Sequence, residues 1–120
     1  MIKTPSMIKL KRGDIVLVEV IFSSGVGAKL RPALVLSANE YNKNRGEIII
    51  SAITSNIKRL HEGDSEITNW EKAGLKVPSI ATAILQTVKN DRIQKSLGQV
   101  EKKDFQQIVK NISKVLGFFE

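Results

Sequence analysis

The segment Lys29-Leu30-Arg31-Pro32-Ala33-Leu34-Val35-Leu36-Ser37 constrains the fold of this chain more than any other. Pro32 has no backbone N–H to donate to a β-ladder, so we expect it at the first residue of a strand or at a sheet edge. The apolar run that follows predicts a core strand, which puts Arg31 at the mouth of that strand. A rigid strand end can aim a guanidinium at a phosphate. The plainer alternative is an exposed arginine beside a turn.

Three other segments have the composition of strands. Ile15 to Phe22 is apolar on both faces in its first half, Glu47 to Thr54 is rich in β-branched residues, and Ser79 to Val88 is mostly apolar. In the segment Glu47 to Thr54, a period of two puts Ile48, Ile50, Ala52 and Thr54 on one face of the strand.

The connections between these strands are polar or glycine-rich. Ser23 to Lys29 contains two glycines and predicts a flexible hairpin loop, and Asn39 to Gly46 predicts a polar connection. Trp70 to Leu75 could form one helical turn closed by Gly74, and Gly98 ends a shorter connection.

One long amphipathic helix is predicted at the end of the chain. Apolar residues recur there at helical spacing, and they are Phe105, Ile108, Val109, Ile112, Val115 and Leu116. Gly117 stands where a helix-terminating glycine is expected. Strands that form a small curled sheet, crossed by one helix, define an α+β domain built on a barrel-like sheet.

Composition sets the broad class. With 120 residues the chain is long enough for one domain, which we assign to residues 1–120. The net charge of +7 favours a polyanionic or acidic protein partner. No cysteine, no signal-peptide core and no stretch long enough to cross a membrane is present, so we expect a cytoplasmic protein.

Several kinds of chemistry are excluded by the residues present. His61 is the only histidine, which rules out a catalytic histidine pair within one chain. A Ser-His-Asp triad is not excluded by count, but His61 lies in a polar stretch that we expect to be an exposed loop. The carboxylates never stand at ligand spacing with histidine or cysteine, so neither a metal site nor another cofactor is expected.

The residues that remain suit RNA cleavage by the substrate's own 2′-hydroxyl. The enzyme then has to orient the chain, neutralise the developing phosphorane charge and move protons. An arginine can supply the charge, and loss of such a donor typically costs about 10² to 10³ in rate. Composition leaves open whether Arg31 also transfers protons, because the pKa of arginine in water is above about 12.

Five segments, in this order, resemble the PemK/MazF toxins of bacterial toxin-antitoxin systems. They are Lys11-Arg12-Gly13-Asp14-Ile15-Val16, the Lys29 to Ser37 run, Ile48 to Ser55, Trp70 to Ser79 and Leu97-Gly98-Gln99-Val100. The resemblance runs to Leu116-Gly117-Phe118 and leaves residues 1–8 as an irregular extension.

This resemblance implies a fold and an activity. The fold would be a small SH3-like barrel of the CcdB/MazF type, with short flanking helices and a long C-terminal helix, in a homodimer. The activity would be that of a metal-independent endoribonuclease that cuts single-stranded RNA at short sequences and leaves a 2′,3′-cyclic phosphate and a 5′-hydroxyl. A cognate acidic antitoxin, partly disordered until it binds, would be its protein partner.

The resemblance also implies catalytic residues. Arg31 would transfer protons and stabilise the phosphate, and Thr54 would hydrogen-bond the scissile phosphate. Ser55 and Asn56, next to Thr54, are further candidates for contacts to RNA.

Other substrate-binding residues follow from the same resemblance. The loop that includes Ser23, Ser24 and Lys29 would gate substrate entry and help to select bases. Many members of the family carry charged or amide side chains on the strand after Ser79, whereas here only Gln86 can take that role.

Two alternatives stay open at this point. One is a toxin of the same fold that binds DNA gyrase, as CcdB does through C-terminal residues that include a tryptophan. In this chain Trp70 is internal and the C-terminus reads Gly117-Phe118-Phe119-Glu120. The other alternative is an RNA-binding module without catalysis, although the chain has few aromatic residues on which bases could stack.

Overall fold

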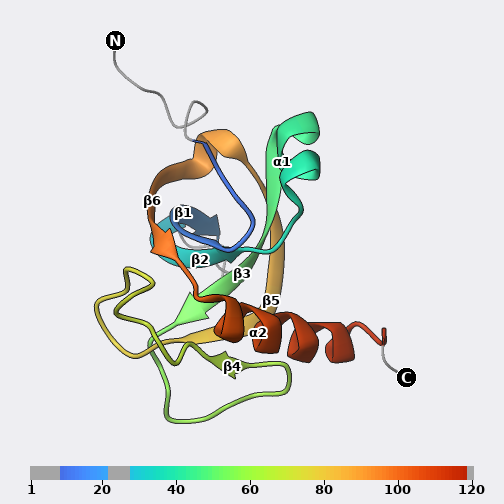
Figure 1. The fold of residues 1–120 in the computed structure, drawn as a ribbon. Helices are drawn as coiled ribbons and strands as arrows, with labels where there is room; N and C mark the ends of the chain where they lie inside the picture. Colours follow the sequence, from blue (N-terminus) through green and yellow to red (C-terminus); the bar gives the residue numbers. More distant parts are fainter. Residues whose placement is uncertain (1–8, 22–27, 119–120) are drawn as a thin grey trace.

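A computed structural model describes residues 9–21 and 28–118 of the chain (Figure 1). The strands are β1 (Asp14–Ile21), β2 (Ala28–Val35), β3 (Glu47–Thr54), β4 (Ser65–Glu66), β5 (Ile80–Lys89) and β6 (Ile93–Gln99). The helices are α1 (Asn39–Arg45), the short 3₁₀ helix η2 (Asn90–Arg92) and α2 (Lys102–Val115).

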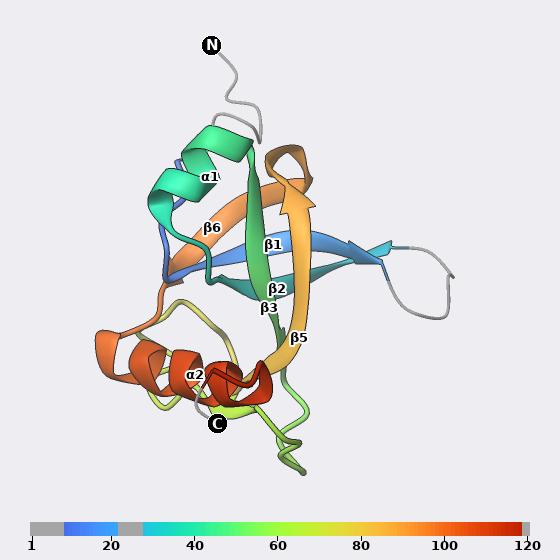
Figure 2. The same cartoon turned by 90° about the vertical axis from the view of Figure 1, so that its right-hand side faces the viewer.

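All six strands form one antiparallel sheet in the order β4-β5-β3-β2-β1-β6. The sheet curls so strongly that β1 and β2 cross β3 and β5 at a steep angle (Figure 2). The predicted α+β fold with a barrel-like sheet is confirmed. In the described residues the barrel is not closed, because β4 and β6 remain the edges of the sheet.

The sheet separates two apolar cores because its central strands are buried on both faces. In β1, Ile15 belongs to one core, whereas Val16 and Val18 belong to the other. In β3, Ile53 faces the first core, and Ile48 and Ile50 face the second. Successive side chains of a strand point to opposite faces, so both cores are built from the same strands.

Helix α2 covers the first core through Ile108 and Ile112, as the helical spacing predicts. The helix ends in a Schellman motif, in which Gly117 has a φ of 83° and the N–H of Phe118 donates to the carbonyl of Ser113. The last turn departs from the expected core-covering stripe, since Val115 is 43% exposed. Within the described part of the chain, no helix is long and apolar enough to cross a membrane.

Residues 39–46, expected to be a polar connection, contain α1 instead. The helix exposes most of its surface, and its one buried residue is polar, so it lacks the apolar stripe that would have revealed it. Asn42 is that residue, and it is held by the hydroxyl of Ser37 and by the Ser37 carbonyl. Gly46, with a φ of 64°, closes the helix and was the one local signal for it.

Strand β6, also expected to be a connection, was missed for a similar reason. Ile93 is its only buried residue, and the others are exposed or half-buried, so its pattern does not alternate as that of a half-buried strand does.

Strand β2 begins earlier than predicted. It starts at Ala28, so Arg31 lies inside the strand opposite Val18, and Pro32 is not its first residue. The expected strand mouth at Arg31 is therefore wrong. Pro32 was also expected at a sheet edge, and on the side of β3 this is the case. Strand β3 pairs with β2 only from Ala33 onward, so the missing N–H of Pro32 removes no hydrogen bond from that ladder.

Gly98 allows the turn that ends at Gly74 to pack directly on β6. A Cβ at Gly98 would overlap the carbonyl oxygen of Ala73. The expected turn over 70–75 is confirmed, with the N–H of Leu75 bonded to the carbonyl of Trp70 and Gly74 at a φ of 92°.

We expect Gly98→Ala to destabilise the protein by about 3 kcal/mol, because backbone atoms rather than a flexible side chain must move. Gly46→Ala is the matched control, since a Cβ there meets nothing within 4 Å and only the left-handed conformation costs energy, about 1 kcal/mol. Urea unfolding midpoints measure both. Equal losses would show that the close approach at Gly98 is not constraining.

Candidate functional site

Arg31 and Thr54 lie on neighbouring strands and share a register. The β2–β3 ladder pairs Val35 with Ile50 and ends at Ala33 with Ala52. Two more residues in the same register bring Arg31 opposite Thr54, on the face of the sheet that Ala33 and Ala52 occupy. The ladder has stopped before it reaches them, so both residues stand where β2 and β3 separate.

Thr54 is the last residue of β3 and is half-buried. Its Oγ1 accepts a hydrogen bond of 3.1 Å from the backbone N–H of Asn56. A threonine hydroxyl has one proton to donate and two lone pairs. The bond from Asn56 therefore occupies a lone pair and leaves the hydroxyl proton for an acceptor such as a phosphate oxygen.

Arg31 is exposed and borders a cavity of about 350 Å³. The cationic and polar residues along this cavity are Arg31, Lys76, Lys95, Ser55 and Ser79, and its apolar walls include Leu17, Ile53, Leu75 and Leu97. A guanidinium and two ammonium groups beside an apolar wall form a site suited to an anion that carries an apolar or aromatic portion.

A second cavity, of about 590 Å³, lies along the residues after β3. Its lining includes Thr54 and Asn56 together with Lys58, Arg59 and His61. Arg31 and Thr54 therefore border different cavities, and Ser55, the residue after Thr54, borders that of Arg31.

His61 is exposed, as expected, in a loop closed by its backbone N–H, which donates to Asp64 Oδ2 at 2.8 Å. No pattern in the sequence connects this loop with Thr54. Only the path of the chain after β3 brings them to one cavity.

The remaining predicted site residues are placed differently. Ser23 and Ser24 lie outside the described residues. Lys29 was expected in the loop, but it belongs to β2 and pairs with Val20 of β1. Gln86 lies in β5 opposite Ile50 and borders a third cavity, of about 480 Å³, together with Arg92.

Lys76, Lys95 and Arg92 were not identified from the sequence. They come from segments far apart in the chain, and of the three only Lys76 lies within a family-like segment, that of Trp70 to Ser79. Lys76 and Lys95 border the cavity of Arg31, whereas Arg92 borders that of Gln86.

The pKa of Tyr41 is raised, chiefly because its hydroxyl donates a 2.6 Å hydrogen bond to Glu47 and also because of burial. Glu47 begins β3 and Thr54 ends it, so this bond anchors α1 at the end of the strand remote from Thr54. Among the described residues, no group of histidine, cysteine or acidic side chains could hold a metal ion.

Strand β5 carries a bulge opposite β3, just before Thr54. The register shifts between Ser51 and Ile53, and Thr82 holds the irregularity in place. Its Oγ1 donates to the carbonyl of Ala52 at 2.7 Å and accepts from the N–H of Ile84 at 3.1 Å.

We expect Thr82→Val to destabilise the protein by about 1 to 3 kcal/mol, since it leaves the Ala52 carbonyl and the Ile84 N–H without their partner. Thr87→Val on the same strand is the control, because Thr87 is exposed and should change stability by less than about 0.5 kcal/mol. Denaturant unfolding compares the two. A neutral Thr82→Val would mean that the bulge does not need the hydroxyl.

Comparison with protein families identifies this chain. Residues 11–116 match the family described as PemK-like, MazF-like toxin of type II toxin-antitoxin system. The match covers far more than half of the chain, so the protein belongs to this family, as the motifs predicted. A search by sequence among curated proteins gave no match.

Solved structures share the fold. An endoribonuclease from a mycobacterial species aligns with a TM-score of 0.73 at 16% identity, over 91% of this chain and 92% of that one. MazF from Deinococcus radiodurans, in its Form-I crystals, aligns with a TM-score of 0.71 at 22% identity, over 90% and 96%. The Mycobacterium tuberculosis toxin MazF-mt6 gives 0.72 at 16% identity, over 87% and 96%. At these identities the likeness shows a common fold.

Proposed function

We propose that this protein is an endoribonuclease toxin that cleaves single-stranded RNA without a metal ion. The observation that carries the proposal is the register that brings Arg31 opposite Thr54 where β2 and β3 separate. Membership of the toxin family supports it, as do similar structures that are named endoribonucleases. The net charge of +7 favours a polyanionic substrate.

The reaction uses a nucleophile that the substrate supplies. The 2′-oxygen attacks the adjacent phosphorus, the bond from phosphorus to the 5′-oxygen breaks, and the products are a 2′,3′-cyclic phosphate and a 5′-hydroxyl. One proton leaves the 2′-hydroxyl and one reaches the departing 5′-oxygen. Arg31 neutralises the charge that develops on the phosphorane, and it is our candidate for proton transfer. Thr54 donates its hydroxyl proton to a non-bridging oxygen.

We expect Arg31→Ala to lower the cleavage rate by about 10² to 10³, the usual loss when a donor to a developing anion is removed. Thr54→Val should lower it less, because a neutral donor is lost. Arg45→Ala is the control, since Arg45 is an exposed arginine on α1 at the other end of β3. Rates are measured on a long unstructured RNA in the presence of EDTA.

Recurrent cuts that survive EDTA in the wild type and vanish in Arg31→Ala would support this mechanism. Wild-type cleavage by Arg31→Ala would overturn it. Intact RNA with every protein would direct attention to a protein target, and a supercoiling assay with purified gyrase would then test the CcdB-like alternative.

We also propose that this toxin works in the cytoplasm as a homodimer of single-domain chains, held inactive by an acidic antitoxin. One of the similar structures is an endoribonuclease in complex with its cognate antitoxin. In this chain, Arg31, Lys76 and Lys95 around an apolar-walled cavity would accept a peptide that carries both carboxylates and apolar side chains.

We expect an acidic product of a neighbouring gene to bind the toxin and stop RNA cleavage, with an affinity that falls as salt is raised. Calorimetry at two ionic strengths measures both properties. Absence of binding by any such acidic protein would contradict this regulation.

A further inference from the structure

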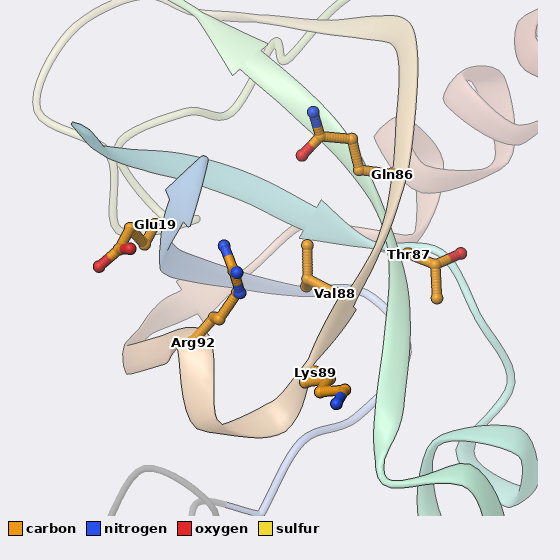
Figure 3. A pocket seen from close by; sticks show the side chains of 6 residues that line it. All are labelled: Glu19, Gln86, Thr87, Val88, Lys89 and Arg92. Carbon is orange, nitrogen blue, oxygen red and sulfur yellow. The ribbon is translucent and has the colours of Figure 1, made fainter. Parts of the chain in front are cut away.

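The cavity that Gln86 borders lies where the curled sheet fails to close. Its lining comes from three places, namely Glu19 of β1, residues 86–89 of β5 and Arg92 of η2 (Figure 3). Strands β5 and β6 are joined through η2 but do not pair in the described residues. The cavity, of about 480 Å³, thus lies between β1 and β5, two strands of the same curled sheet.

The floor of this cavity is apolar and carries one amide. Val88, which is 8% exposed, belongs to the second core. Gln86 stands two residues before it and therefore on the same face, whereas Thr87 points to the other side (Figure 3). The half-buried amide of Gln86 has no hydrogen-bond partner among the described residues, so a donor and an acceptor remain available to a ligand.

A cation faces this amide. The guanidinium of Arg92 extends toward the same space as Val88 and Gln86 (Figure 3). Glu19 borders the same cavity, yet Arg92 forms no ion pair with it or with any other described residue. An arginine that leaves a nearby carboxylate unused can offer its full set of donors to an incoming anion.

The cavity and Thr54 lie on one face of the sheet. Gln86 is opposite Ile50, and Ile50 precedes Thr54 by four residues on β3. At about 3.3 Å per residue, this separates the two places by roughly 13 Å along the strand. The nucleotide that contacts Thr54 cannot also fill the cavity, but a neighbouring nucleotide on the same RNA strand can reach it.

We propose that this cavity is a second nucleotide subsite, in which Arg92 binds a phosphate of the RNA and Gln86 hydrogen-bonds the base that rests on Val88. The inference rests on the proposed ribonuclease function and adds to it a residue, Arg92, and a division of roles. Glu19 at the rim repels phosphate, so the backbone of the RNA runs on the Arg92 side of the cavity.

The two roles make different predictions. A phosphate contact releases a counterion whatever the base, and on single strands each contact contributes about 0.7 to the slope of log K against log salt. A base contact changes the ranking of bases and leaves this slope unaltered. Arg92→Gln should therefore lower the slope by about 0.7, and Gln86→Ala should flatten the differences between bases.

The experiment measures fluorescence anisotropy with 2′-O-methyl oligouridines that carry a single A, G or C. These probes cannot be cut, so binding is measured with the intact wild-type protein and does not depend on activity. Lys103→Gln and Gln106→Ala are the controls, because both residues are exposed on α2, away from the cavity.

A lower slope in Arg92→Gln with an unchanged base ranking, and the converse in Gln86→Ala, would support the subsite. An Arg92→Gln slope equal to that of Lys103→Gln would overturn it, as would a Gln86→Ala ranking equal to that of the wild type. Failure of the wild type to bind the probes would also overturn it. The two proposals can fail separately. If the wild type does not cleave RNA but Arg92→Gln and Gln86→Ala show these binding effects, only the ribonuclease proposal is contradicted.

Discussion

Burial of the central strands on both faces is the constraint on which this structure depends. Ile15 and Val16 are adjacent and both fully buried, yet they belong to different cores. A strand in this position cannot slip by one residue, because a slip exchanges the sets of side chains on the two faces. The register of β1, β2 and β3 is therefore strongly specified, and so is the placement of every polar residue that these strands carry to their ends.

The candidate site uses that rigidity at the point where the ladder ends. Ala33 and Ala52 form the last pair between β2 and β3, and beyond them the two strands carry Arg31 and Thr54 on the same face. Strand ends fixed by a packed core can hold functional groups more precisely than loops can. Thr82 adds to this by tying the bulge of β5 to the carbonyl of Ala52.

The curl of the sheet brings residues from distant segments of the chain to the cavities of the candidate site. Lys76, from the segment before β5, comes to the same cavity as Arg31 of β2 because the sheet bends round on itself. Lys95 borders the cavity of Arg31, and Arg92 borders that of Gln86. A flat sheet with the same strand order would spread these charges over a wide surface, where salt would screen them from one another.

The sequence by itself determined the strands with regular apolar patterns, the C-terminal helix and the motifs that contain Arg31 and Thr54. Helical periodicity revealed α2, and the β-branched composition of β3 predicted that strand to the residue. Helix α1 and strand β6 expose most of their residues, so no pattern marked them. Only the tertiary structure decided that Arg31 lies within β2, and which distant cations stand near it, because both depend on pairing between segments remote in the chain.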